Sequence, residues 1–270
     1  MNIELEKKKS FFEKISDKLN DNETKSVLFL IFLAIFVRII FSLLFNTGHP
    51  TDLTNFKAWA MDVNKKGIFD FFQPKPVGTW CDYPPGYIWI LYFFGKLYSF
   101  IDPNFTNWFG SVFSAFIKFP AILCDVINVY LIYFLSKRYV PSSIAIASAT
   151  IYAFQPAVFY ESAVWGQMDS VTLTFLILSV IFMIDKKYDL AILMTAINCM
   201  IKPQGILLIP LLTFVTLYNK EFKKFILGTL YGIAYVFIIT LPITRDFFNV
   251  VPWLYEHYVA QADLYPFSSI

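Results

Sequence analysis

Long apolar runs, separated by short clusters of lysine and arginine, constrain the fold of this chain more than any other feature of its sequence. The first run, Ser26–Phe45, has 20 residues and one charged side chain, Arg38. A bilayer core about 30 Å thick needs roughly 20 apolar residues for each spanning helix, so this run is long enough to cross. Only 16% of the residues are charged, whereas soluble domains carry roughly 25%. The sequence therefore predicts an all-α, polytopic membrane helix bundle.

Residues 1–25 are polar and rich in lysine, and we expect them to form a cytoplasmic tail, because lysine clusters mark the cytoplasmic ends of spans. The segment "FNTGHP" after the first run offers no small-residue cleavage site, so the run is interpreted as an uncleaved span. Phe11, Phe12, Ile15 and Leu19 recur at helical spacing, which leaves open a tail on the membrane surface or a solvated tail. Residues 26–270 are predicted to form the transmembrane domain.

Further apolar runs are expected to cross in alternating directions, at about residues 112–135, 142–160, 171–184 and 225–242. The cations of "SKR" at 136–138 favour a cytoplasmic end for the first of these runs, which places residues 46–111 outside as one long loop that carries helices. Gly86–Phe100, the apolar part of that loop, has 15 residues interrupted by Lys96. It suits an interfacial or re-entrant helix better than a span. If it crossed instead, "SKR" would face outward.

Residues 198–206, "NCMIKPQGI", interrupt the apolar pattern with a lysine, a proline and a glutamine. The apolar pieces on either side, Leu190–Ile201 and Gly205–Tyr218, have 12 and 14 residues. Each makes only about 18–21 Å of helix, too short to cross alone. Both outer flanks, "DKK" and "NKEFKK", are cationic, so both ends are expected on the cytoplasmic side. A short re-entrant-like hairpin satisfies these conditions, with Lys202-Pro203-Gln204 at its tip in an outward-facing cavity, and gives about seven membrane segments in all.

Charged residues inside the apolar runs are the first candidates for function, since ionisable groups at membrane depth are costly and usually face a cavity or a partner. Lys202 either reaches the outer interface, or pairs with a carboxylate such as Asp169, or binds a phosphate with Gln204 as a further donor. Pairing of Arg38 with Asp125 is left open, because their inferred depths differ by roughly 5–10 Å at 1.5 Å per residue. A structural role is favoured for both.

Residues of the long outer loop form a second group of candidates. In "GHPTDLTNFKAWA", Asp52 lies at a loop-to-helix junction, where it can cap the helix or act as a general base, and the two roles are compatible. In "CDYPPGYIW", the two prolines fit the start of a helix. Asp82 and Tyr83 before them are weaker candidates for substrate contact.

A third group, Trp165, Gln167 and Asp169 in "ESAVWGQMDS", is predicted at a turn on the outer membrane face. Tryptophan alone is a common interfacial anchor. Together, the ring, the amide and the carboxylate also suit sugar recognition, in which the ring stacks on sugar C–H faces and the polar groups bind hydroxyls. The residues alone leave both interpretations open.

Other kinds of site are disfavoured. A net charge of +2 and the lack of a basic aromatic stripe argue against nucleic-acid binding. The three cysteines imply no disulfide framework, because two of them fall inside apolar runs. His49 and His257 are the two histidines, and the sequence shows neither a metal-ligand pattern nor a glycine-rich phosphate loop. We therefore predict no metal and no cofactor.

Taken in order, these motifs resemble those of a known family. The segments "HPTDLTNFKAWA", "CDYPPGYIWI", "KFPAILCDVINVYLIY", "WGQMDSVTLTFLILS", "LAILMTAINCMIKPQGILLIPLL" and "LYPFSS" are similar to segments of bacterial and archaeal relatives of the second mannosyltransferase of glycosylphosphatidylinositol assembly. More broadly, they resemble GT-C membrane glycosyltransferases. The resemblance covers about residues 35–270, and "WGQMDS" and "KPQ" are specific in combination, while each alone is weak.

The resemblance implies a membrane glycosyltransferase that moves a sugar, mannose or another hexose, from a polyprenyl-phosphate donor to an acceptor hydroxyl on a glycan or lipid. It implies that Asp52 is the base, that Lys202 and Gln204 contact the donor phosphate, and that "WGQMDS" and "DYPP" surround the sugar. Transfer is expected outside the cytoplasm, with inversion, at the cell membrane or at the endoplasmic reticulum membrane of a eukaryote. Such relatives have ten or more spans, so this chain is expected to be a C-terminally truncated fragment.

Two other functions remain open at this point. A transporter or flippase of lipid-linked saccharide also places charges on broken helices, but such folds often contain paired internal repeats, and "KPQ" occurs once here. A non-catalytic membrane assembly subunit would require the polar residues above to be structural. Release or transfer of sugar from polyprenyl-phosphate sugars distinguishes all three functions.

Overall fold

The computed structural model describes residues 21–45, 48–74 and 76–264, and in this part of the chain every regular element is helical. The all-α prediction is therefore confirmed for these residues. The amphipathic pattern at residues 11–19 and most of the "LYPFSS" segment lie outside the described residues.

Three helices in the described part of the chain are long and apolar enough to cross a membrane: α2 (Asn22–Leu44), α6 (Ser111–Ser136) and α12 (Phe222–Thr244). They coincide with three of the predicted spans. A fourth crossing results if α7 (Ser142–Phe154) and Pro156–Trp165 count as one bent span. The remaining apolar helices are shorter, among them α9 (Asp169–Ile184) and α10 (Tyr188–Ile201). An integral membrane protein is supported, and seven membrane segments remain a prediction.

The helix predicted at 142–160 is interrupted by a bend of 49°. Pro156 has no N–H to continue the helix, and it forces the preceding Gln155 into an extended conformation with φ −65° and ψ 123°. The Gln155 side chain then caps the next helix by accepting from the Val158 amide at 2.9 Å. That helix, α8 (Pro156–Phe159), runs into the π-helical segment η1 (Tyr160–Trp165). The bend directs the chain toward the turn that carries Gln167.

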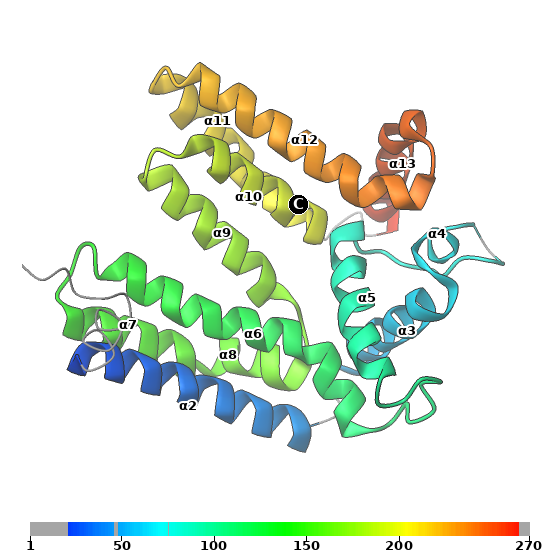
Figure 1. Cartoon of the computed structure of the whole chain (residues 1–270), viewed down its shortest axis with the longest axis horizontal. Helices are drawn as coiled ribbons and strands as arrows, with labels where there is room; N and C mark the ends of the chain where they lie inside the picture. Colours follow the sequence, from blue (N-terminus) through cyan, green and yellow to red (C-terminus); the bar gives the residue numbers. More distant parts are fainter. Residues whose placement is uncertain (1–20, 46–47, 75, 265–270) are drawn as a thin grey trace, which may run out of the picture.

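The helices form two groups joined by α9. α2, α6 and α7 pack together, and α9 leads from them to α10, α11 (Ile209–Tyr218) and α12 (Figure 1). The segment between α2 and α6 folds at one end of both groups into α3 (Pro50–Lys66), α4 (Ile68–Phe71) and α5 (Pro85–Ser99) (Figure 1). α5, expected as a short helix of the outer loop, packs against α3, α6 and α10.

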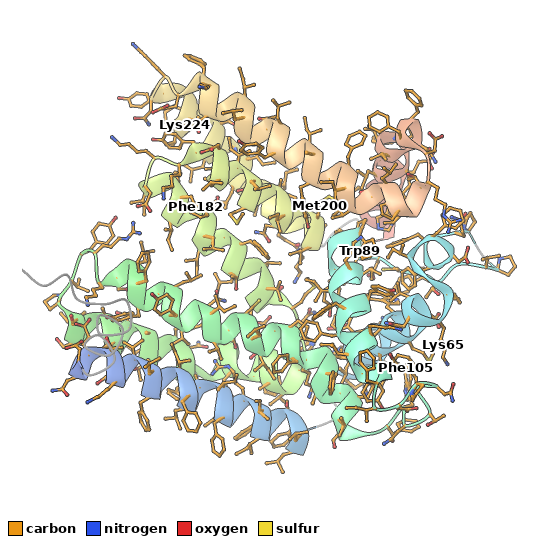
Figure 2. All side chains as sticks on the ribbon, in the orientation of Figure 1. Lys65, Trp89, Phe105, Phe182, Met200 and Lys224 are labelled. Carbon is orange, nitrogen blue, oxygen red and sulfur yellow. The ribbon has the colours of Figure 1, made fainter. Side chains whose placement is uncertain are left out.

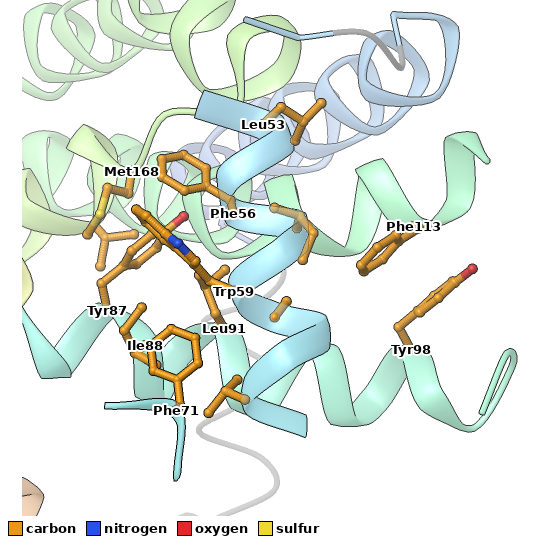
Figure 3. Close-up of a cluster of buried hydrophobic side chains, with 14 of the residues drawn as sticks. Leu53, Phe56, Trp59, Phe71, Tyr87, Ile88, Leu91, Tyr98, Phe113 and Met168 are labelled. Carbon is orange, nitrogen blue, oxygen red and sulfur yellow. The ribbon is translucent and has the colours of Figure 1, made fainter. Parts of the chain in front are cut away.

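Aromatic side chains form the core of the α3–α5 segment. Phe56 and Trp59 of α3 and Tyr87 of α5 are at most 2% exposed and lie together in this core (Figure 3). The Phe56 and Tyr87 rings meet edge to face, with centroids 5.1 Å apart. Trp59 also donates its indole N–H to the Trp80 carbonyl at 2.8 Å. Buried rings with satisfied polar atoms make a rigid base for the first turn of α3.

The chain reverses direction at Lys202. α10 ends at Ile201, Lys202 is extended, and the 3-10 helix η2 (Pro203–Leu208) leads into α11. The Lys224 ammonium donates to the Lys186 carbonyl at 3.0 Å, so the two cationic flanks meet. α10 and α11 thus form a hairpin. Met200 lies near its tip, and Lys224, at the start of α12, lies at the opposite end (Figure 2). The return requires Gly205, because a Cβ there would lie 2.7 Å from the Cys199 amide nitrogen.

Residues 250–264, which follow the last predicted span at about 225–242, form a helix, α13 (Val250–Leu264). It follows the short 3-10 helix η3 (Phe247–Asn249). Trp253 and His257, one helical turn apart, stack at 4.9 Å with their planes 10° apart. Both rings also meet the edge of Phe72, which docks α13 onto the α3–α5 segment.

Candidate functional site

Asp52, the predicted base, lies in the first turn of α3 with its side chain 27% exposed. The alternative that Asp52 caps this helix is wrong, because α3 begins at Pro50 and His49 is the N-cap residue. Its Oδ2 atom accepts hydrogen bonds from the Trp165 indole Nε1 at 2.8 Å and from Gln167 Nε2 at 3.0 Å. No donor among the described residues hydrogen-bonds the other oxygen, Oδ1. One oxygen therefore orients the carboxylate, and the other keeps its lone pairs available.

Trp165 and Gln167 reach the same carboxylate because Gly166 between them adopts a left-handed conformation, with φ 88°. An L side chain is strained there, and a Cβ would also lie 3.2 Å from a side chain of α6. The amides of Gly166 and Gln167 both donate to the Glu161 carbonyl, at 2.9 and 3.0 Å, which closes η1. We call residues 165–169 the Gly166 turn.

The Gly166 turn is joined directly to the start of α3. The His49 amide donates to the Trp165 carbonyl at 3.1 Å, and the two rings stack at 4.8 Å with their planes 19° apart. Gly48 approaches so closely that a Cβ would lie 2.6 Å from that carbonyl oxygen. His49 Nδ1 is 3.6 Å from Asp52 Oδ2, so a protonated His49 would form an ion pair with the carboxylate. These contacts fix Asp52 relative to the turn.

Tyr83 fixes the orientation of the Gln167 amide. Its hydroxyl donates to Gln167 Oε1 at 3.4 Å, and the same oxygen accepts from the Met168 amide at 3.2 Å. Because the amide oxygen is occupied, the amide nitrogen is the atom that faces Asp52. Burial raises the pKa of Tyr83, so its hydroxyl keeps its proton and remains a donor. Asp82, partly buried beside it, acts electrostatically on Tyr83.

Lys202 forms an ion pair with Asp169, the first residue of α9. This is the carboxylate pairing that the sequence left as one alternative. The exposed fractions of the two side chains are 18% and 39%, so the pair remains accessible. Gln204, two residues further along η2, is exposed.

Glu161 is a neighbour of this pair that sequence reasoning missed. The carboxyl groups of Glu161 and Asp169 act electrostatically on each other, and Lys202 acts on both. The available signal was its position in "ESAVWGQMD", on the N-terminal side of the same turn.

The Gly166 turn brings two clusters together. Gln167 bonds Asp52, and Asp169, two residues later, pairs with Lys202. Consecutive Cα atoms are about 3.8 Å apart, so the Cα atoms of Gln167 and Asp169 are separated by at most about 7.6 Å. One turn therefore joins the cluster around Asp52 to the cluster around the accessible Lys202.

A buried charge network supports the turn. Arg38 Nε donates to Asp125 Oδ2 at 2.9 Å, and both side chains are fully buried. Asp125 also accepts from the hydroxyls of Tyr152 at 2.9 Å, Ser162 at 2.5 Å and Ser170 at 2.6 Å. Ser162 lies on η1 and Ser170 on α9, so one carboxylate holds the chain on both sides of the Gly166 turn.

The depth comparison that argued against pairing Arg38 with Asp125 fails because α6 extends past the end of α2. Lys118 of α6 donates to the carbonyl of Phe45, the C-cap residue of α2, at 2.5 Å. Residues 111–117 of α6 therefore project beyond α2, by roughly 10 Å at 1.5 Å per residue. The comparison assumed that both helices end at one level.

Among the residues that the structure describes, no group of three or more His, Cys, Asp or Glu side chains could hold a metal ion. A family model described as dolichyl-phosphate-mannose-protein mannosyltransferase matches residues 82–244, more than half of the 270-residue chain. The match includes Tyr83, the Gly166 turn and Lys202, and it begins after Asp52. No curated protein matches the chain.

Proposed function

Because the chain belongs to the dolichyl-phosphate-mannose-protein mannosyltransferase family, we propose that it transfers a hexose, mannose by its family, from a polyprenyl-phosphate donor to an acceptor hydroxyl on a glycan or lipid. The membrane helices and the family together support an integral membrane glycosyltransferase. We place the reaction on the extracytoplasmic side. The cationic flanks "DKK" and "NKEFKK" favour a cytoplasmic location for the end of the helices that lies opposite to Lys202.

The Asp52 carboxylate carries the proposal, since a general base must offer a lone pair to the proton that it removes. Trp165 and Gln167 hold Oδ2, and Oδ1 takes the proton of the acceptor hydroxyl. The hydroxyl oxygen attacks the anomeric carbon, and the bond from that carbon to the phosphate oxygen breaks, leaving its electron pair on the phosphate. A phosphate leaves without a proton from a second carboxyl group, in contrast to the alcohol released by a glycosidase. Attack opposite the leaving group inverts the anomeric centre.

Lys202 stabilises the charge on the departing phosphate. A bound phosphate replaces Asp169 at the ammonium, and Gln204 donates a further hydrogen bond to it. The released Asp169, together with Trp165 and Gln167 of the same turn, contacts the hydroxyls and the ring face of the sugar. Asp82 and Tyr83 line the same space from the loop before α5.

The experiment is an Asp52→Asn substitution, assayed with a polyprenyl-phosphate mannose and a panel of hydroxyl acceptors. Loss of the base should lower turnover by about 10²- to 10⁴-fold, whereas donor affinity should stay close to that of the native protein. Asp70→Asn is the matched control, since Asp70 is a carboxylate of α4 in the same segment, and its turnover should not change. Undiminished turnover in Asp52→Asn would exclude Asp52 as the base. Vesicle uptake of the donor without sugar transfer would favour the flippase instead.

A further inference from the structure

α13 contacts both parts of the proposed site, the segment before Lys202 and the loop that carries Tyr83. The Tyr258 hydroxyl donates to the carbonyl of Cys199, in the last turn of α10, at 3.0 Å. The neighbouring His257 Nε2 lies 3.1 Å from the carbonyl of Tyr83. Adjacent residues of one helix therefore contact the chain that carries Lys202 and the loop that orients Gln167.

The contact at Cys199 has a cause in the sequence. In an α-helix the carbonyl of each residue accepts from the amide four residues later, and the residue four after Cys199 is Pro203, which has no N–H. The preceding carbonyl, of Asn198, is satisfied by the Lys202 amide at 2.9 Å. The Cys199 carbonyl would thus lack an intrahelical donor, and the Tyr258 hydroxyl supplies one. The proline that breaks the helix beside Lys202 also creates the attachment point for α13.

The contact at Tyr83 is supported by ring packing. His257 stacks on Trp253 of the same helix, and the edge of Phe72 meets its ring. Burial lowers the pKa of His257, so the ring is neutral near pH 7. A neutral ring with its proton on Nε2 donates to the Tyr83 carbonyl. That contact holds the residue whose hydroxyl fixes the Gln167 amide.

We propose that Tyr258 and His257 are positioning residues, which set the geometry of Lys202 and of the Asp52–Gln167 pair relative to each other. This role rests on the proposed function, in which Lys202 binds the donor phosphate and Asp52 is the base. Among the described residues, this pair hydrogen-bonds the carbonyls of Tyr83 and Cys199 and not Asp52 or Lys202. Each acts through a backbone carbonyl, Tyr258 on the phosphate side and His257 on the base side.

Tyr258→Phe tests the phosphate side, because it removes only the hydroxyl. Tyr255→Phe is the matched control, since Tyr255 lies on the same helix and is 71% exposed. Hydrogen exchange of the amides of Lys202 and of residues 204–206 should become faster in Tyr258→Phe and remain unchanged in Tyr255→Phe. The affinity for polyprenyl-phosphate mannose should fall by about three- to tenfold in Tyr258→Phe, with kcat nearly unchanged. In a Lys202→Ala background the same substitution should have no further effect on affinity.

His257→Phe and His257→Gln test the base side. Phenylalanine keeps the ring that stacks on Trp253 and loses the donor, whereas glutamine restores an N–H. His257→Phe should lower kcat by about three- to tenfold without changing donor affinity, and His257→Gln should recover part of that loss.

The outcomes separate this inference from the proposed function. If native protein fails to bind the donor, the proposed function is wrong, while faster exchange at 202–206 in Tyr258→Phe still supports the attachment of α13 to that segment. Unchanged exchange in Tyr258→Phe overturns the positioning role. So does faster exchange with unchanged donor affinity, or an equal loss of affinity with and without the Lys202 side chain.

Discussion

Replacing Asp125 by alanine removes the acceptor at the centre of the buried network. Arg38 stays fully buried at 0% exposure and loses its carboxylate partner. Removing one member of a buried ion pair costs about 3–5 kcal/mol, because the other charge is left uncompensated. The three hydroxyls bonded to Asp125 add to this cost wherever they find no new acceptor, and Ser162 has one alternative in the Val158 carbonyl at 3.3 Å. We therefore expect a loss of at least about 3–5 kcal/mol in the free energy of unfolding.

The comparison that isolates the charge is the double variant Arg38→Met/Asp125→Leu. Replacing a whole buried pair by apolar side chains of similar volume is often close to neutral. The double variant should therefore unfold within about 1–2 kcal/mol of the native protein, well above Asp125→Ala. Glu221→Ala serves as the control, since its pair with Lys224 is solvent-accessible, and it should change stability by less than about 1 kcal/mol.

The assay is reversible unfolding of the purified protein in mixed micelles, followed by helix content and by tryptophan fluorescence. The variants are compared as a double-mutant cycle, which reports the coupling energy of the pair. The reasoning is refuted if Asp125→Ala is as stable as the native protein, or if the double variant is no more stable than Asp125→Ala. The second result would mean that the hydroxyl contacts dominate the network.

Two further predictions concern Lys202 and His257. Lys202→Ala should weaken binding of a polyprenyl-phosphate mannose by about ten- to a hundredfold, as expected for a lost charge-assisted hydrogen bond; exposed Lys96→Ala should not change it, and equal affinities in a titration would exclude the phosphate role. Burial lowers the pKa of His257 below the ordinary 6.5, so its neutral form stabilises the fold above about pH 6.5 and this contribution is lost as the pH falls. The unfolding midpoint should thus fall more between about pH 7.5 and about pH 5.5 in the native protein than in His257→Gln, and parallel shifts would contradict this linkage.

Much of the arrangement follows from patterns that are local in sequence. Apolar run length was sufficient to locate α2, α6 and α12, since a spanning helix needs a minimum number of apolar residues. The interruption at Lys202 and Pro203 marked the end of α10, because Pro203 has no N–H with which to continue the helix. Asp52 was selected at a loop-to-helix junction, and Trp165 and Gln167 at a turn between two apolar runs, and the structure places all three in one hydrogen-bonded cluster. Their roles in the reaction remain predictions.

Features that depend on how helices pack were beyond the sequence patterns. The pairing of Arg38 with Asp125 requires the offset between α2 and α6, and the contact of Lys118 with the end of α2 sets that offset. α13 mixes apolar and polar residues without a long apolar run, so run length did not reveal it. Its partners, Tyr83 and Cys199, are far away in the sequence. Glu161 was missed because a lone glutamate before a turn carries no distinctive pattern.

The π-helical segment η1 makes the number of residues between 160 and 165 a constraint of its own, beside the side chains that they carry. Its closing bond runs from the Gly166 amide to the Glu161 carbonyl at 2.9 Å, a spacing of five residues, whereas an α-helix uses four. Because the wider turn absorbs the additional residue, deleting one residue here would let the segment close as an α-helix with the chain after it in nearly the same phase. A further residue added as ordinary α-helix would instead rotate everything after it by about 100°, and Trp165 would face away from Asp52. Among relatives of this chain, an extra residue in this segment would therefore mark a protein whose indole no longer meets the carboxylate, whereas a one-residue gap would be compatible with the contact.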